Sequence, residues 1–192
     1  MIKAIIFDFG GVIGIDGYWA WLQKQVPNFA ERELFFHHLA DQIDRGTITK
    51  DEYLNILTKE TGVAKSNIWP EIFQTIAINQ ELLTIITSLK KQYKIGLLSN
   101  INATFLEEIF INHDLYKYFD EMFISSQHGV IKPEAAAFEK CLSMLKVTKD
   151  EALFFDDRQV HVDAANKFGL QAFVYTTNEK LTQDLREHGI TV

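Results

Sequence analysis

Several residue types are scarce in this sequence, and each shortage excludes a class of protein. The chain has one cysteine, Cys141, among 192 residues, so it can form neither an internal disulfide nor a metal cluster built from cysteines. Its 19 lysines and arginines are outnumbered by 26 acidic residues, which argues against a nucleic-acid partner. No apolar run approaches the ~20 residues of a membrane-spanning helix, and none resembles a signal peptide. We therefore expect a cytoplasmic protein that contacts neither nucleic acid nor membrane.

Short apolar runs recur along the chain and predict buried strands. They occupy residues 3–10, 94–100, 121–127, 151–157 and 170–176. Between and after them, apolar residues repeat at intervals of three and four, which indicates helices over 80–92, 103–113, 133–147, 160–170 and 178–189. Strands that alternate with helices of this length predict an α/β fold with a doubly wound, Rossmann-like, mainly parallel sheet.

The stretch 16–77 interrupts this alternation. It contains no pattern typical of a strand, and its apolar spacing indicates helices over 18–26, 31–43, 50–62 and 67–78. Thr49, followed three residues later by Glu52, predicts a capped helix start. We therefore expect an α-helical cap at residues 16–77, inserted into an α/β core made of residues 1–15 and 78–192.

Polar side chains are concentrated where the predicted strands end. Asp8 follows the first apolar run, Ser99 and Asn100 end the second, and Asp156 and Asp157 end the fourth. In an open α/β sheet, ligands bind at the carboxyl ends of the strands. Three carboxylates at one edge repel one another unless they hold protons or share a cation. Hard oxygen ligands of this kind suit Mg²⁺.

Lys132 can reach the same edge. It follows a short apolar run and precedes Pro133, which we expect at the first position of the next helix. A lysine suits a phosphate oxygen as a point charge, and backbone N–H groups at a helix start favour anions. These groups together predict a site at which a carboxylate attacks phosphorus in line while cations neutralise the developing charge.

Four motifs support a more specific interpretation. FDFGGV (7–12), LLSN (97–100), KPE (132–134) and FFDD (154–157) occur in this order. In sequence and spacing the chain resembles the haloacid dehalogenase-like hydrolase superfamily, in its phosphatase-like branch with a helical cap after the first motif. It is similar to bacterial members such as a glucose-1-phosphate phosphatase, in which a glycine also stands two residues after the first acid.

The resemblance implies a magnesium site. Asp8 would be the nucleophile that forms an aspartyl-phosphate, and would also bind Mg²⁺. The backbone carbonyl of Gly10 would be a second metal ligand. Asp157 would be the main acidic ligand of the last motif, with Asp156 as its partner, bound directly or through water.

The resemblance also implies a phosphate site and a substrate class. Ser99 and Asn100 would hold the transferring phosphoryl group, and Lys132 would pair with Asp8 and the phosphate. A cap over this edge would contact the rest of the substrate. We expect a small phosphorylated metabolite, with sugar phosphates first, and the sequence leaves the oligomeric state open.

The chain departs from the family pattern at Gly10, where many related phosphatases carry a second acid that protonates the leaving group. A positioned acid contributes typically ~10²–10⁴-fold to the rate. Cap residues that could replace it are Asp16, His37, His38 and Asp41.

A second departure is His161, which stands where some members have a further acid. We assign neither it nor Asp163 to the site. Two alternatives stay open: a 2-haloacid dehalogenase, and a silent phosphate-binding homologue that lacks the usual acid. The paired acids Asp156 and Asp157 favour phosphoryl transfer, because the family's dehalogenases lack them.

Overall fold

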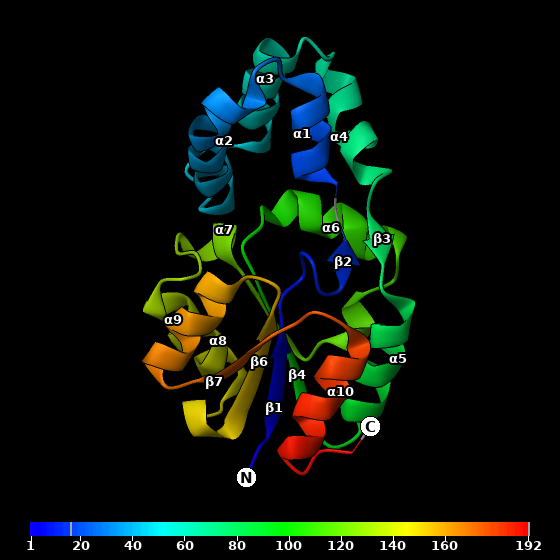
Figure 1. Ribbon diagram of the computed structural model, residues 1–192, viewed down its shortest axis with the longest axis vertical. Coiled ribbons are helices and arrows are strands. Elements are labelled where there is room, and N and C mark those ends of the chain that lie inside the picture. The colour runs from blue at the N-terminus through cyan, green and yellow to red at the C-terminus, as the bar shows by residue number, and fades with distance from the viewer. Residues whose placement is uncertain (16, 192) are drawn as a thin grey trace.

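The computed structural model describes residues 1–15 and 17–191 and is built around one parallel sheet (Figure 1). The sheet has five strands in the order β5-β4-β1-β6-β7, with every neighbouring pair parallel. Their bounds are β1 (Ala4–Phe7), β4 (Lys94–Ser99), β5 (Glu121–Ile124), β6 (Ala152–Asp156) and β7 (Gln171–Val174). The predicted α/β fold with a parallel sheet is confirmed.

Helices cover both faces of this sheet (Figure 1). They are α5 (Gln80–Leu89), α6 (Ala103–Asn112), α8 (Ala135–Leu145), α9 (Gln159–Phe168) and α10 (Asn178–Glu187), with short turns α7 (Ser125–His128), η1 (Tyr116–Tyr118) and η2 (Lys149–Glu151). In β1, Ile5 and Phe7 pack with α5, α6 and α10, whereas Ala4 and Ile6 pack with α8 and α9. Because alternate side chains enter opposite layers, a strand buried on both faces is apolar throughout.

Cys141 belongs to the α8 layer and is buried, as a small apolar residue would be. Burial raises the pKa of its thiol to about 12, so the reactive thiolate is scarce at neutral pH. Within the described residues, no helix combines the length and apolar composition needed to cross a membrane.

Four helices stand together over the carboxyl ends of the strands (Figure 1). These are α1 (Tyr18–Gln25), α2 (Phe29–Asp44), α3 (Lys50–Thr61) and α4 (Lys65–Phe73), and we refer to them as the cap helices. They share an apolar cluster of their own, which Phe105 of α6 joins from the core. The predicted start of α3 is confirmed: Thr49 and Glu52 form a reciprocal capping box.

The chain leaves for the cap helices and returns from them through two short paired strands. β2 (Gly14–Ile15) and β3 (Ala77–Ile78) run antiparallel, with Gly14 opposite Ile78. The expectation of no strand within 16–77 is therefore wrong at Ala77. The periodicity over 67–78 extended a helix too far, because the chain beyond Phe73 turns to pair with β2.

Two other sequence expectations also differ from the structure. The run 121–127 was expected to be a strand throughout, but β5 ends at Ile124 and the chain turns at once into α7. Pro133 does not occupy the first position of α8. The Lys132–Pro133 peptide bond is cis, and Glu134 is the N-cap residue.

Candidate active site

The sheet register brings the ends of three strands to one level. Phe7, at the end of β1, is paired with Leu97 of β4 and with Phe155 of β6. The residue after Phe7 is Asp8, whose backbone N–H donates to the Phe155 carbonyl at 2.9 Å. The polar residues that follow these strands therefore meet at one edge, as the sequence predicted.

Lys132 enters this edge from the loop before α8 and is almost fully buried, with 1% of its surface exposed. Its Nζ lies 2.9 Å from Oδ1 of Asp8 and 2.6 Å from Oδ2 of Asp156. Asp8 and Asp156 are themselves buried. One ammonium therefore bridges two carboxylates in a site from which water is largely excluded.

Asn100 fixes the position of that lysine. Its Nδ2 donates to the Lys132 carbonyl and its Oδ1 accepts from the Lys132 N–H, both at 2.8 Å. The side chain of Asn100 is therefore bonded to the lysine's backbone. Ser99 and Asn100 both line the cavity described below.

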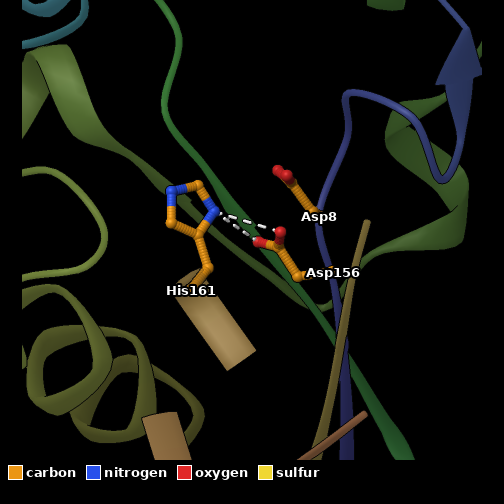
Figure 2. Close-up of side chains that lie close together, drawn as sticks. All are labelled: Asp8, Asp156 and His161. Carbon is orange, nitrogen blue, oxygen red and sulfur yellow. Dashed lines mark hydrogen bonds and ion pairs between the residues drawn. The ribbon is translucent and has the colours of Figure 1, made fainter. Parts of the chain in front are cut away.

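His161 adds a contact that the sequence interpretation missed. Its Nδ1 lies 3.0 Å from both carboxylate oxygens of Asp156 (Figure 2). Burial, assisted by the charge of Lys132, lowers the pKa of His161, so the ring is neutral and its Nδ1–H donates. The backbone N–H of Arg158 donates to Oδ1 of Asp156 at 2.9 Å. Asp156 is therefore held from three directions.

Burial and charge shift the titration of this cluster in different directions. Burial raises the pKa of Asp8 to about 7, with repulsion from Asp156 adding to it and Lys132 opposing it. For Asp156, burial is outweighed by Lys132 and His161, and its pKa is lowered. Burial alone would lower the pKa of Lys132, but the two carboxylates outweigh it and raise that pKa. Lys132 and Asp156 are therefore charged, and Asp8 holds its charge with difficulty.

Asp157 completes the acidic cluster from a more exposed position. Desolvation and the nearby charge of Asp156 raise its pKa, and its own charge in turn contributes to the raised pKa of Asp8. Three carboxylates thus face one lysine. Asp8, Asp156 and His161 also place one ligand atom each within 4.8 Å of the others. This excess of oxygen ligands and negative charge fits a hard divalent cation.

A cavity of about 360 Å³ opens between this cluster and the cap helices. Of the predicted site residues, it is lined by Asp8, Gly10, Ser99, Asn100 and Asp157. Lys132 and Asp156 do not line the cavity. Lys132 contacts Asp8, which does line it, and Asp156 in turn contacts Lys132.

The structure distinguishes between the four residues that were considered as replacements for the missing acid. His37 and Asp41, on one face of α2, line the cavity. His38 is exposed and is not part of the lining. Asp16 lies outside the described residues.

A model of the haloacid dehalogenase-like hydrolase family matches residues 2–169. The chain belongs to this family. It is 26% identical to a sesquiterpene phosphatase of Aspergillus oryzae, over 96% of this chain and 95% of that protein. It is 27% identical to a D-ribitol-5-phosphate phosphatase of Bacteroides thetaiotaomicron, over 90% of this chain and 91% of that one.

Solved structures of haloacid dehalogenase-like enzymes share the fold. A wild-type family enzyme of Bacteroides thetaiotaomicron, solved with magnesium and inorganic phosphate, superposes with a TM-score of 0.79 at 20% identity. The match covers 97% of this chain and all of that one. The expectation that the chain is a hydrolase of this family is therefore confirmed, and its relatives include phosphatases.

In this haloacid dehalogenase-like hydrolase, Gly11 leaves space for the carboxylate of Asp157. Gly11 has φ = +70°, and a Cβ placed there would lie 2.3 Å from Oδ2 of Asp157. The left-handed backbone and the close approach both require glycine. The second glycine of FDFGGV therefore shapes the place of the Asp157 carboxylate.

Gly11→Ala is expected to displace Asp157 and to weaken metal binding by about 10–100-fold, the usual effect of disturbing the support of a metal ligand. Calorimetric titration with Mg²⁺ measures this directly. Gly62→Ala is the matched control, because Gly62 has φ = +73° with nothing within 4 Å of the added Cβ. The control tests backbone strain alone and should keep normal metal affinity. Equal affinity in both variants would contradict the role of Gly11.

Proposed function

We propose that this chain is a Mg²⁺-dependent phosphomonoester hydrolase that works through an aspartyl-phosphate on Asp8. The observation that carries the proposal is the position of Asp8. It lies on the floor of a cavity under the cap helices, and a buried lysine at 2.9 Å orients one of its oxygens. A carboxylate held in this way is placed to act as a nucleophile.

The residues present fit a magnesium ion. Asp8, the carbonyl of Gly10 and Asp157 would hold it, because the oxygens of Asp156 already bond to Lys132 and His161. We therefore propose Asp156 as the residue that positions Lys132, with any contact to the metal through water. A bound Mg²⁺ would supply positive charge next to the phosphate oxygens and would keep Asp8 ionised.

The chain's own groups account for the rest of the reaction. An oxygen of Asp8 attacks phosphorus, the bond from phosphorus to the alcohol oxygen breaks, and the alcohol leaves with a proton. Ser99 and backbone N–H groups near Asn100 stabilise the negative charge of the phosphoryl oxygens, and the charge of Lys132 adds to this from behind Asp8. Water then attacks the phosphorus of the aspartyl-phosphate, which releases inorganic phosphate and regenerates Asp8.

His37 and Asp41 are the candidates for the proton donor among the described cap residues that line the cavity. The donor's removal is expected to lower kcat by about 10²–10⁴-fold for an alkyl phosphate. It should change kcat little for p-nitrophenyl phosphate, whose leaving group needs no proton. His37→Asn and Asp41→Asn, each assayed on both esters, identify the donor. His38→Asn is the matched control, and an equal loss on both esters would count against proton donation.

The proposed function is tested by measuring phosphate release from a panel of small phosphomonoesters, with Mg²⁺ and with chelator. Release that requires Mg²⁺ is the expected result. In parallel, Mg²⁺ should raise the thermal midpoint of the protein, because a ligand that binds the folded state stabilises it. Absence of release from every ester, by folded protein with Mg²⁺, would favour the silent phosphate-binding homologue.

The dehalogenase alternative is tested by halide release from a 2-haloacid. The acids Asp156 and Asp157 argue against it, because displacement of halide from carbon needs no cluster that attracts a cation. The finer expectation from the sequence, a small phosphorylated metabolite with sugar phosphates first, stays a prediction from the sequence alone. Relatives named for a sesquiterpene and for ribitol 5-phosphate differ widely in the alcohol part, so the choice depends on the walls of the cavity.

A further inference from the structure

The cavity above Asp8 is larger than a phosphate group requires. Its volume of about 360 Å³ lies at the lower end of the range for small-molecule sites. A phosphoryl group would occupy the floor, between Asp8, Ser99 and Asp157. The remaining walls, which come mainly from the cap helices and α6, would therefore contact the alcohol part of a substrate.

Aromatic side chains form much of these walls. They are Tyr18, Trp19, Tyr53, Trp69 and Phe105. The hydroxyl of Tyr53 is hydrogen-bonded to that of Tyr18, and Nε1 of Trp69 donates to a glutamate of α6. Isoleucine and leucine side chains from β2, α2, α3, α4 and α6 complete the lining. The wall is therefore largely apolar, and the polar side chains that it takes from the cap helices other than the two tyrosines, His37, Asp41 and Asp44, all come from α2.

The charge of the wall restricts the substrate further. Asp41 and Asp44 of α2 line the cavity, whereas no lysine or arginine of the described cap residues does. Arg158, from the core side, is the arginine of the described lining, which also includes the imidazoles of His37 and His161. A second anionic group on the substrate would therefore meet Asp41 and Asp44, and it would find no lysine or arginine among the described cap residues of the lining.

Two cations of the cap are engaged with the core. Arg45, just after α2, is paired with Glu134, and it also donates to the carbonyl of Gly129. Lys50 is paired with Glu108 of α6. Its ammonium lies over the ring of Phe105, 4.7 Å from the centroid. These ion pairs tie the cap helices to the core and hold both cations outside the cavity lining.

We infer that the substrate is the phosphate monoester of an uncharged, predominantly apolar alcohol. This inference rests on the proposed function and specifies its substrate class. Apolar area removed from water contributes roughly 25 cal/mol per Å² to binding, whereas buried hydroxyls without partners oppose it. Sugar phosphates, bisphosphates and phosphorylated acids should therefore be poorer substrates.

Three esters of six-carbon primary alcohols test the inference with a constant type of leaving group. They are n-hexyl phosphate, sorbitol 6-phosphate and the phosphate ester of 6-hydroxyhexanoate. We expect kcat/KM for hexyl phosphate to exceed both others by at least about tenfold, a ratio within reach of differences in an apolar site. Equal or better turnover of either polar ester would overturn the inference and leave the proposed phosphatase activity intact.

A binding measurement keeps the inference testable if none of the esters is hydrolysed. Calorimetry of the wild-type protein with Mg²⁺ ranks the three esters against inorganic phosphate. Hexyl phosphate should bind at least about tenfold more tightly than phosphate or the two polar esters. If no ester is hydrolysed but hexyl phosphate binds most tightly, the proposed function alone is contradicted. If hexyl phosphate binds no more tightly than inorganic phosphate, the inferred substrate class is contradicted.

A charge reversal in the wall provides an independent test. Asp41→Lys introduces a cation into the lining and should shift the ratio of kcat/KM, or of affinity, toward the 6-hydroxyhexanoate ester by at least about fivefold. Asp41→Asn removes the acid without adding a cation and should shift the ratio less. Glu31→Lys, on the exposed start of α2 and outside the lining, controls for net charge. The same ratio in all three variants would show that this wall does not contact the alcohol.

Discussion

Replacement of Asp8 by asparagine is expected to abolish turnover and, at the same time, to stabilise the metal-free protein. Activity should fall at least about 10⁴-fold, because the residue that forms the covalent intermediate is lost. Stability should rise because three carboxylates share one lysine, and the variant leaves Lys132 paired with Asp156 alone. The residue most important for activity is thus unfavourable for folding.

The pH dependence of that gain follows from the sign of the pKa shift. The folded-state pKa of Asp8, about 7, lies above its ordinary value of 3.8, so its ionisation destabilises the fold. The penalty is absent below about pH 4, grows as pH rises, and is complete above about pH 7, where it reaches at most about 4 kcal/mol. The gain from Asp8→Asn should therefore be larger at pH 8 than at pH 5 by roughly 2–3 kcal/mol.

Urea unfolding with chelator at these two pH values measures the gain, and phosphate release with Mg²⁺ measures the loss of activity. Asp163→Asn is the matched control, because Asp163 is exposed and outside the cavity lining. It should keep wild-type activity. More than about a hundredth of wild-type activity in Asp8→Asn would exclude Asp8 as the nucleophile.

Lys132→Met should also abolish activity but should have the opposite effect on stability. Methionine fills a similar volume, yet it leaves Asp8 and Asp156 buried without their shared cation. Breaking a buried ion pair from one side typically costs about 3–5 kcal/mol. The loss should be largest at pH 8 and smaller at pH 5, where Asp8 takes up a proton more readily.

Urea unfolding with chelator tests this prediction as well. Lys117→Met is the matched control, because Lys117 forms an exposed ion pair with Asp114 at 2.6 Å, and exposed pairs contribute little. A loss no greater than that of the control would show that the buried carboxylates are already protonated or hydrated. The two active-site variants together separate loss of function from loss of stability.

The sequence predicted where the residues of the candidate site meet, because that position follows from backbone geometry. Asp8, Ser99 and Asp156 each end an apolar run, and parallel strands bring such ends together. The hydrogen bonds between these side chains were harder to predict from the sequence. The sequence identifies Asn100 as a polar residue at a strand end, but its bonding to Lys132 depends on a loop 32 residues away.

His161 could have been found by a more local argument. It lies five residues after Asp156, in the first turn of a helix that follows the strand almost at once. Such a tight turn returns the first helical side chains to the strand end. The short strand at Ala77–Ile78 gave no comparable signal, because two residues are too few to show a period and its partner Gly14–Ile15 lies more than 60 residues earlier.

The place of β1 at the middle of the sheet also governs the order in which the chain can fold. Ala4, in β1, pairs with Lys94 on one side and with Ala152 on the other, so both partners are synthesised much later. Contacts so distant in sequence form late, and slowly compared with local ones. A nascent chain therefore carries Asp8 from the outset but lacks its catalytic surroundings until β6 has emerged. Premature termination before that point yields a product that lacks Asp156 and Asp157 and leaves one side of β1 unpaired.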